Sequence, residues 1–272
     1  MSLLDPVLIA ELLLLGSCTG FLAGLLGIGG GMLMVPFVTM ILSHRGVAAD
    51  LAVKMAIATS MATILFTSIS SVRAHHRRGA VRWAIVRSMA PGIVGGGLLA
   101  GAGAFGLLKG AALALLFALF VGFSATQMLR DRKPQPHRQM PGAAGTAAAG
   151  GVVGFVSGLV GAGGAFISVP FMVWCNVPMH NAVATSAALG FPIALANTAG
   201  YVVSGWHLRP AVPGALGYLV LPVLLVIATA SVVVAPLGAR VAHGMDTGGL
   251  RKVMATMLYV LAAYMTWRGL TA

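Results

Sequence analysis

Apolar residues follow one another in runs of 18 or more along almost the whole chain, and short polar segments separate the runs. A helix needs about 20 such residues to cross the hydrocarbon core of a bilayer. The runs show no alternation of apolar and polar positions, so they do not predict the strands of a membrane barrel. The pattern predicts an all-α polytopic membrane protein that is embedded in the lipid bilayer.

Ten helical segments are predicted from the ends of these runs. Five lie in the first half, at residues 6–26, 32–42, 51–74, 83–105 and 108–129, and five in the second half, at residues 143–160, 166–177, 179–204, 212–237 and 250–268. The second and seventh segments are short. A helix over 32–42 extends about 16 Å, roughly half of the hydrocarbon core. We expect either tilted partial spans or re-entrant half-helices at these two places.

One glycine-rich stretch occurs twice. Residues 20–37 read GFLAGLLGIGGGMLMVPF, residues 154–171 read GFVSGLVGAGGAFISVPF, and ten of the eighteen positions are identical. Each copy passes from a small-residue helix face through a glycine cluster into a short apolar helix. A repeat at a constant offset indicates that the whole architecture is doubled. The predicted organisation is a first transmembrane repeat (1–129), a cytoplasmic linker (130–141) and a second transmembrane repeat (142–272), which together form one integrated membrane domain.

The distribution of Lys and Arg bears on the orientation of the two halves. If all ten segments cross and the N-terminus lies outside, eleven of the fifteen basic residues outside the apolar runs face the cytoplasm, as the positive-inside rule requires. If the two short segments re-enter, the best orientation gives ten against five. Inverted repeats are the recurrent plan of secondary transporters. We therefore predict two inverted repeats of about five helical segments each, with a short broken helix in each half, and eight spans with two re-entrant segments as the alternative.

Composition and charge limit the classes of function. Only 8% of the residues are charged, whereas soluble domains have about a quarter. The net charge of +12 does not predict nucleic-acid binding, because the basic residues are concentrated in two short loops and form no continuous patch. The chain contains no Ser/His/Asp set, HExxH motif or CxxC motif. We therefore predict no enzyme activity, no metal site and no cofactor.

The two glycine clusters predict an anion-binding site. A helix that begins at a break inside the membrane exposes free backbone N–H groups and the positive end of its dipole. Broken helices in corresponding halves are also where transporters bind their substrates. The predicted substrate-binding residues are the glycines of both breaks and polar residues of the neighbouring segments: Gly29, Gly30, Gly31, Thr59, Ser60, Gly163, Gly164, Thr185, Ser186 and Asn197.

Two alternatives stay open for the polar residues. Ser and Thr hydroxyls in membrane helices commonly bond the backbone of their own helix or of a neighbour, and such bonds would account for both Thr-Ser pairs without a ligand. Glu11 is the one carboxylate clearly inside a predicted span. An intramembrane carboxylate is a functional candidate, but a residue this close to the end of a span also reaches the interface.

Three features of the sequence are the paired glycine motifs, AIATS at residues 56–60 and HRRGAVRW at residues 76–83. Together they resemble the TauE/SafE family, the sulfite-exporter-like permeases of bacterial inner membranes. The resemblance covers about residues 15–265. It implies a multi-pass permease of the inner membrane that moves small anions such as sulfite, sulfoacetate and other sulfur-containing organic anions. The second copy has Ala165 where the first has Gly31, and Ser168 where it has Met34, so the two half-sites are not equivalent.

The predicted function is a secondary transporter that exports sulfite or a sulfur-containing organic anion. An anion channel would use the same site, and a membrane accessory protein that moves no solute is a further alternative. Glycines at every fourth residue in the first and sixth segments, and at GxxxG spacing within 92–101, predict close helix packing. This packing could lie within the chain or between two copies, which leaves a homodimer open.

Overall fold

The computed structural model describes residues 5–26, 31–130, 138–208, 214–241 and 247–271. Its helices are α1 (Pro6–Leu26), α2 (Gly31–His44), α3 (Ala49–Arg77), α4 (Trp83–Leu98), α5 (Phe105–Leu107), α6 (Gly110–Arg130), α7 (Ala143–Val160), α8 (Ala165–Trp174), α9 (Met179–Ser204), α10 (Leu221–Val241) and α11 (Thr247–Thr271). A π-helical segment (Leu99–Ala104) joins α4 to α5. A 3-10 turn (Trp206–Leu208) follows α9.

Each of the ten predicted segments forms a helix, but the ninth begins later than predicted. The predicted segment starts at residue 212, whereas α10 begins at Leu221. Two short antiparallel strands precede it, β1 (Ala215–Leu216) and β2 (Leu219–Val220), with Ala215 opposite Val220. Gly214 and Gly217 have φ angles of 74° and 62°, a conformation that glycine adopts readily and that ends a helix.

Five stretches of helix are long and apolar enough to cross a membrane: Ala49–Arg77, Trp83–Leu107, Gly110–Arg130, Ala143–Val160 and Met179–Ser204. Four shorter apolar helical stretches accompany them: Pro6–Leu22, Gly31–His44, Ala165–Trp174 and Leu221–Ala235. The prediction of an all-α polytopic membrane protein is confirmed.

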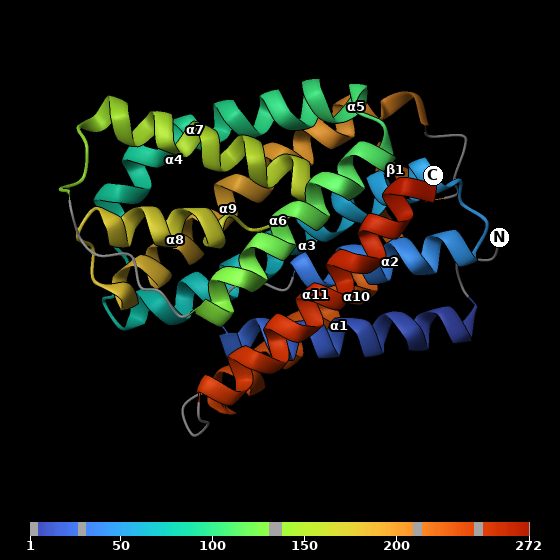
Figure 1. The fold of residues 1–272 in the computed structure, drawn as a ribbon, viewed down its shortest axis with the longest axis horizontal. Coiled ribbons are helices and arrows are strands. Elements are labelled where there is room, and N and C mark those ends of the chain that lie inside the picture. The colour runs from blue at the N-terminus through green and yellow to red at the C-terminus, as the bar shows by residue number, and fades with distance from the viewer. Residues whose placement is uncertain (1–4, 27–30, 131–137, 209–213, 242–246, 272) are drawn as a thin grey trace.

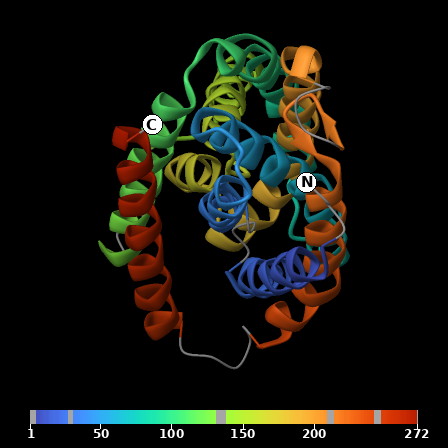
Figure 2. The ribbon, with the colours of Figure 1, turned by 90° about the vertical axis from the view of Figure 1, so that its right-hand side faces the viewer.

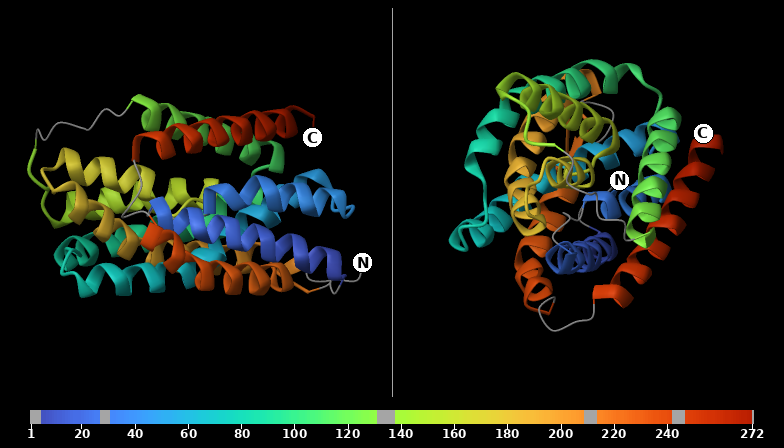
Figure 3. Two further views of the ribbon diagram at one scale, coloured as in Figure 1. Left: turned by 90° about the horizontal axis from the view of Figure 1, so that it is seen from below. Right: turned by 60° about the vertical axis from the view of Figure 1, so that its left-hand side comes forward.

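The main contacts join helices from different halves of the chain. α1 packs along α10, α4 along α7, and α6 along α11, while α3 packs against α9. The two short helices, α2 and α8, begin near the middle of the bundle and run toward opposite ends (Figure 1). Longer helices surround them when the bundle is viewed along its long axis (Figure 2). Both chain ends lie at the same end of the bundle (Figure 3).

Glycines allow the α4–α7 and α1–α10 pairs to approach closely. A Cβ atom on Gly92 would lie 1.7 Å from the carbonyl oxygen of Ala147, and one on Gly96 would lie 2.0 Å from that of Gly151. In the other pair, the Ser231 hydroxyl donates a hydrogen bond of 2.9 Å to the carbonyl oxygen of Gly16. The glycine faces noted in the sequence therefore pack within the chain, as small-residue faces do in membrane helix pairs.

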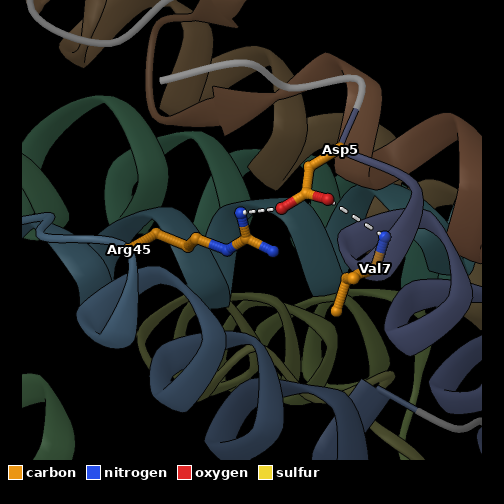
Figure 4. Close-up of polar contacts among 3 residues, drawn as sticks. All are labelled: Asp5, Val7 and Arg45. Atoms are coloured by element: carbon orange, nitrogen blue, oxygen red, sulfur yellow. Dashed lines mark hydrogen bonds and ion pairs between the residues drawn. The ribbon is translucent and has the colours of Figure 1, made fainter.

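Asp5 fixes the start of α1 at one end of the bundle (Figure 4). Its Oδ1 accepts a hydrogen bond of 3.1 Å from the backbone N–H of Val7, and its Oδ2 lies 2.7 Å from Nη1 of Arg45, just beyond α2. The hydrogen bond from Arg45, assisted by the one from Val7, lowers the pKa of the Asp5 carboxyl below its usual value of 3.8. The contact ties the first turn of α1 to the end of α2.

Replacing Asp5 with asparagine is expected to lower the melting temperature slightly at pH 7, because it removes the ion pair with Arg45. The folded carboxyl has the lower pKa, so its contribution is complete above the unfolded pKa and is lost as the pH falls through the folded value. The difference between Asp5→Asn and the wild type should therefore shrink below about pH 4. Thermal unfolding in detergent at several pH values measures it, with Glu11→Gln as the control. A difference that is constant with pH would contradict the assignment.

Candidate functional site

The structure brings the two helix breaks together. Gly29 and Gly30 lie outside the described residues, whereas Gly31 is the first residue of α2. A Cβ atom on Gly31 would lie 3.0 Å from the carbonyl oxygen of Gly161 and 2.8 Å from the Cδ1 atom of Ile64. A Cβ atom on Gly163 would lie 3.6 Å from the same Ile64 atom. Both breaks therefore meet beside one side chain of α3.

The second break exposes the start of α8. Gly161, with φ 73°, ends α7 and donates a hydrogen bond of 2.8 Å to the carbonyl oxygen of Ser157. Gly164, with φ 75°, is the N-cap of α8 and provides no side-chain cap. Its carbonyl oxygen accepts from the N–H of Ser168 at 2.9 Å. The first N–H groups of a helix have no partner within the helix, and in α8 these groups belong to Ala165 and Phe166.

Thr59 and Thr185 have corresponding structural roles in the two halves. The Oγ1 atom of Thr59 accepts a hydrogen bond of 3.1 Å from the N–H of Val220, immediately before α10. The Oγ1 atom of Thr185 accepts one of 3.0 Å from the N–H of Arg82, immediately before α4. Each hydroxyl thus bonds a backbone N–H at the start of a neighbouring helix, and these contacts account for both threonines as links between helices.

Ser60 and Ser186 occupy matching positions but differ in their bonding. The hydroxyl of Ser186 on α9 lies 2.8 Å from that of Ser168 on α8. Ser60 on α3 is buried, and its hydroxyl has no hydrogen-bond partner in the described parts of the chain. The first copy has Met34 at the position that matches Ser168, so it lacks the second hydroxyl. The difference between the two half-sites that the sequence shows thus becomes a difference in hydrogen bonding.

Asn197 lies at the contact between α9 and α7. Its Nδ2 donates to the carbonyl oxygens of Ile193, at 2.8 Å, and Gly154, at 3.3 Å. One turn further along α9, the buried Tyr201 hydroxyl donates to the carbonyl oxygen of Gly158. The two side chains hold α9 against α7. Tyr201 is not among the residues predicted from the sequence, because its partner lies 43 residues earlier in the chain.

Ser157 is a second buried polar residue that the sequence does not indicate. It is 1% exposed, and its hydroxyl has no hydrogen-bond partner within the described ranges. The Oγ atom lies 3.2 Å from the position of a Cβ atom on Gly164. The repeat gave no signal for it, because the matching position of the first copy is Ala23.

Two charged residues lie apart from the breaks. Glu11 is exposed on α1. Lys54 on α3 is buried, with its ammonium 3.3 Å from the carbonyl oxygen of Gly106, 3.8 Å from the Asp50 carboxylate and 5.6 Å from the centre of the Tyr218 ring. It therefore links α3 to α5 and to the β1–β2 turn. Over the described part of the chain, no cluster of three His, Cys, Asp or Glu residues could hold a metal ion.

The architecture defines the class as a polytopic helical membrane protein with two short helices that begin inside the bundle. Within this class, the chain belongs to the TauE/SafE family, because the family profile described as "Sulfite exporter TauE/SafE" matches residues 12–265. The predicted family is confirmed, and the protein is a membrane transporter of this family.

Several relatives span nearly the same length. A probable membrane transporter protein of Haemophilus influenzae is 34% identical over 255 residues, which cover 93% of this chain and 96% of the relative. One of Methanocaldococcus jannaschii is 27% identical over 279 residues, with 95% and 96% covered. One of Bacillus subtilis is 28% identical over 228 residues, with 75% and 83% covered. No solved structure matches the chain.

Proposed function

We propose that this protein is a secondary transporter that exports sulfite or a sulfur-containing organic anion across the inner membrane. The observation that carries the proposal is the start of α8. Its N-cap is Gly164, its first N–H groups lack partners within the helix, and it begins near the middle of the bundle (Figure 1). Free N–H groups and the positive end of a helix dipole favour an anion. The family of sulfite exporters to which the chain belongs supports the same substrate class.

An inverted repeat would supply the mechanism of transport. If each helix is replaced by its counterpart in the other half, the α1–α10 pair becomes the α7–α4 pair. The α3–α9 pair and the α6–α11 pair each become themselves. The helices of all four pairs are in contact. The short helices α2 and α8 correspond and run in opposite directions (Figure 1). Transporters of this plan alternate access by moving one part against another around a fixed central site. We propose ten crossings with the N-terminus outside, because this orientation gives the basic loops to the cytoplasm.

A flux assay tests the proposal. The purified protein is reconstituted into liposomes loaded with labelled sulfite or short sulfonates, and the release of each anion is compared with that from liposomes without protein. We expect saturable efflux of at least one of these anions. Efflux at the background rate for all of them would overturn the proposal. Unitary currents in planar bilayers would instead identify an anion channel, which has no alternating access.

A further inference from the structure

We propose that Ser157 is a substrate-binding residue whose hydroxyl donates a hydrogen bond to the anion at the start of α8. The inference rests on the proposed function, since it needs an anion as the transported substrate. It adds a residue that neither the glycine motif nor the Thr-Ser pairs indicate.

Two independent observations meet at this place. The first is the helix start, where Ala165 and Phe166 present N–H groups that α8 itself leaves unbonded. The second is the Ser157 hydroxyl, which lies 3.2 Å from the position of a Cβ atom on Gly164 and has no hydrogen-bond partner among the residues that the structure describes. Ser157 belongs to α7 and the N–H groups to α8, so donors from two helices lie close to Gly164.

Among the described residues, Ser157 shares the lack of a partner with Ser60 and Thr198, but of these three hydroxyls Ser157 is the one placed beside the N-cap of α8. Thr39, Thr63 and Ser124 each donate to the carbonyl oxygen four residues earlier, which is the ordinary solution for a hydroxyl inside a membrane helix. Ser157 makes no such bond within the described ranges. A buried hydroxyl without a partner destabilises the folded state, and a bound oxyanion would remove this cost.

The surroundings of the hydroxyl define the chemistry of the ligand. Hydroxyl and N–H groups can all donate, so the complementary group is an anion with several acceptor oxygens, as in sulfite or a sulfonate. Val153 and Ile193 place apolar groups beside Gly164. Charge-assisted hydrogen bonds are stronger in apolar surroundings than in water.

The first break lacks the same donor. Ala23 stands at the position that matches Ser157, so the first copy offers no hydroxyl there. We therefore place a single anion at the second break rather than one at each break. The sequence difference between the copies then selects which of the two helix starts holds the substrate.

The variant Ser157→Ala tests the inference by separating binding from stability. Loss of a hydrogen bond to a charged group is expected to raise both the KM for sulfite efflux and the Kd for sulfite in detergent by about 10- to 100-fold. The melting temperature without sulfite should stay unchanged or rise, because the variant removes a buried polar group that has no partner. Ser124→Ala is the matched control, since Ser124 is equally buried and bonds only its own helix. It should leave KM and Kd unchanged.

The outcomes distinguish this inference from the proposed function. If the wild type transports sulfite and Ser157→Ala has the same KM and Kd, the inference is overturned and the transport function stands. If Ser157→Ala melts at a lower temperature without a change in Kd, Ser157 is a structural residue and the inference is overturned as well. If the wild type binds sulfite, loses affinity in Ser157→Ala and yet shows no flux, the site stands and the transport function fails. If the wild type neither binds nor transports sulfite or sulfonates, both fail.

Discussion

Replacing Gly92 with alanine is expected to force α4 away from α7. Among glycine-to-alanine substitutions in this chain, it should cause one of the largest losses of folding stability. The added Cβ atom would lie 1.7 Å from the carbonyl oxygen of Ala147 and 2.6 Å from its carbonyl carbon. Both are backbone atoms, so no side-chain rotation relieves the overlap. Overpacking of a close interface costs about 1–3 kcal/mol or more, and the separation would weaken contacts along the rest of the helix pair.

Gly95→Ala is the matched control, because Gly95 lies on the same helix and a Cβ atom there would meet nothing within 4 Å. Alanine also favours a helix over glycine by up to about 1 kcal/mol. Thermal unfolding in detergent, followed by tryptophan fluorescence, should therefore show a clearly lower melting temperature for Gly92→Ala and an unchanged or higher one for Gly95→Ala. Equal melting temperatures for the two variants would show that α4 and α7 do not approach as closely as the structure has them.

The second large effect is expected at Gly164, the N-cap of α8. A Cβ atom would lie 2.5 Å from the Cδ1 atom of Ile193 and 3.0 Å from a methyl group of Val153. The φ angle of 75° adds a conformational cost of about 1–2 kcal/mol for a residue with a side chain. Gly164→Ala should lower the melting temperature and abolish sulfite efflux, since α8 could no longer begin at the same point.

Gly163→Ala provides the comparison at the neighbouring position. A Cβ atom there would lie 3.6 Å from Ile64, an ordinary van der Waals distance, and Gly163 is not among the glycines with positive φ. The variant is expected to keep its melting temperature and at least part of its efflux. If Gly163→Ala lost transport while Gly164→Ala retained it, the proposed geometry of the break would be wrong.

The site was only partly predictable from the sequence. The glycine repeat indicated both breaks, because a cluster of residues without side chains interrupts a helix whatever surrounds it. The sequence predicts Thr59 and Thr185 as site residues, but it does not predict their hydrogen-bond partners. The hydrogen bonds join residues 161 and 103 positions apart, so they exist only after α10 and α4 have packed against α3 and α9.

Two further features depended on context in the same way. The apolar run before residue 221 predicts a helix, whereas Gly214 and Gly217 turn the chain into the β1–β2 hairpin. The hairpin packs so closely against α9 that only glycine fits at residue 217. A Cβ atom on Gly217 would lie 2.6 Å from the carbonyl oxygen of Tyr201. Ser157 gave no signal at all, because a single serine in an apolar helix is unremarkable until its neighbours are known.

The sequence by itself determined the membrane class, the family, the approximate ends of nearly all the helices and the position of the two breaks. These follow from local properties, namely the length of apolar runs and the absence of side chains at glycine. Only the tertiary structure decided which helices pair, which hydroxyls are used in helix contacts and which are left without a partner. A hydrogen bond depends on two groups within about 3 Å of each other, and the packing of distant segments sets that distance.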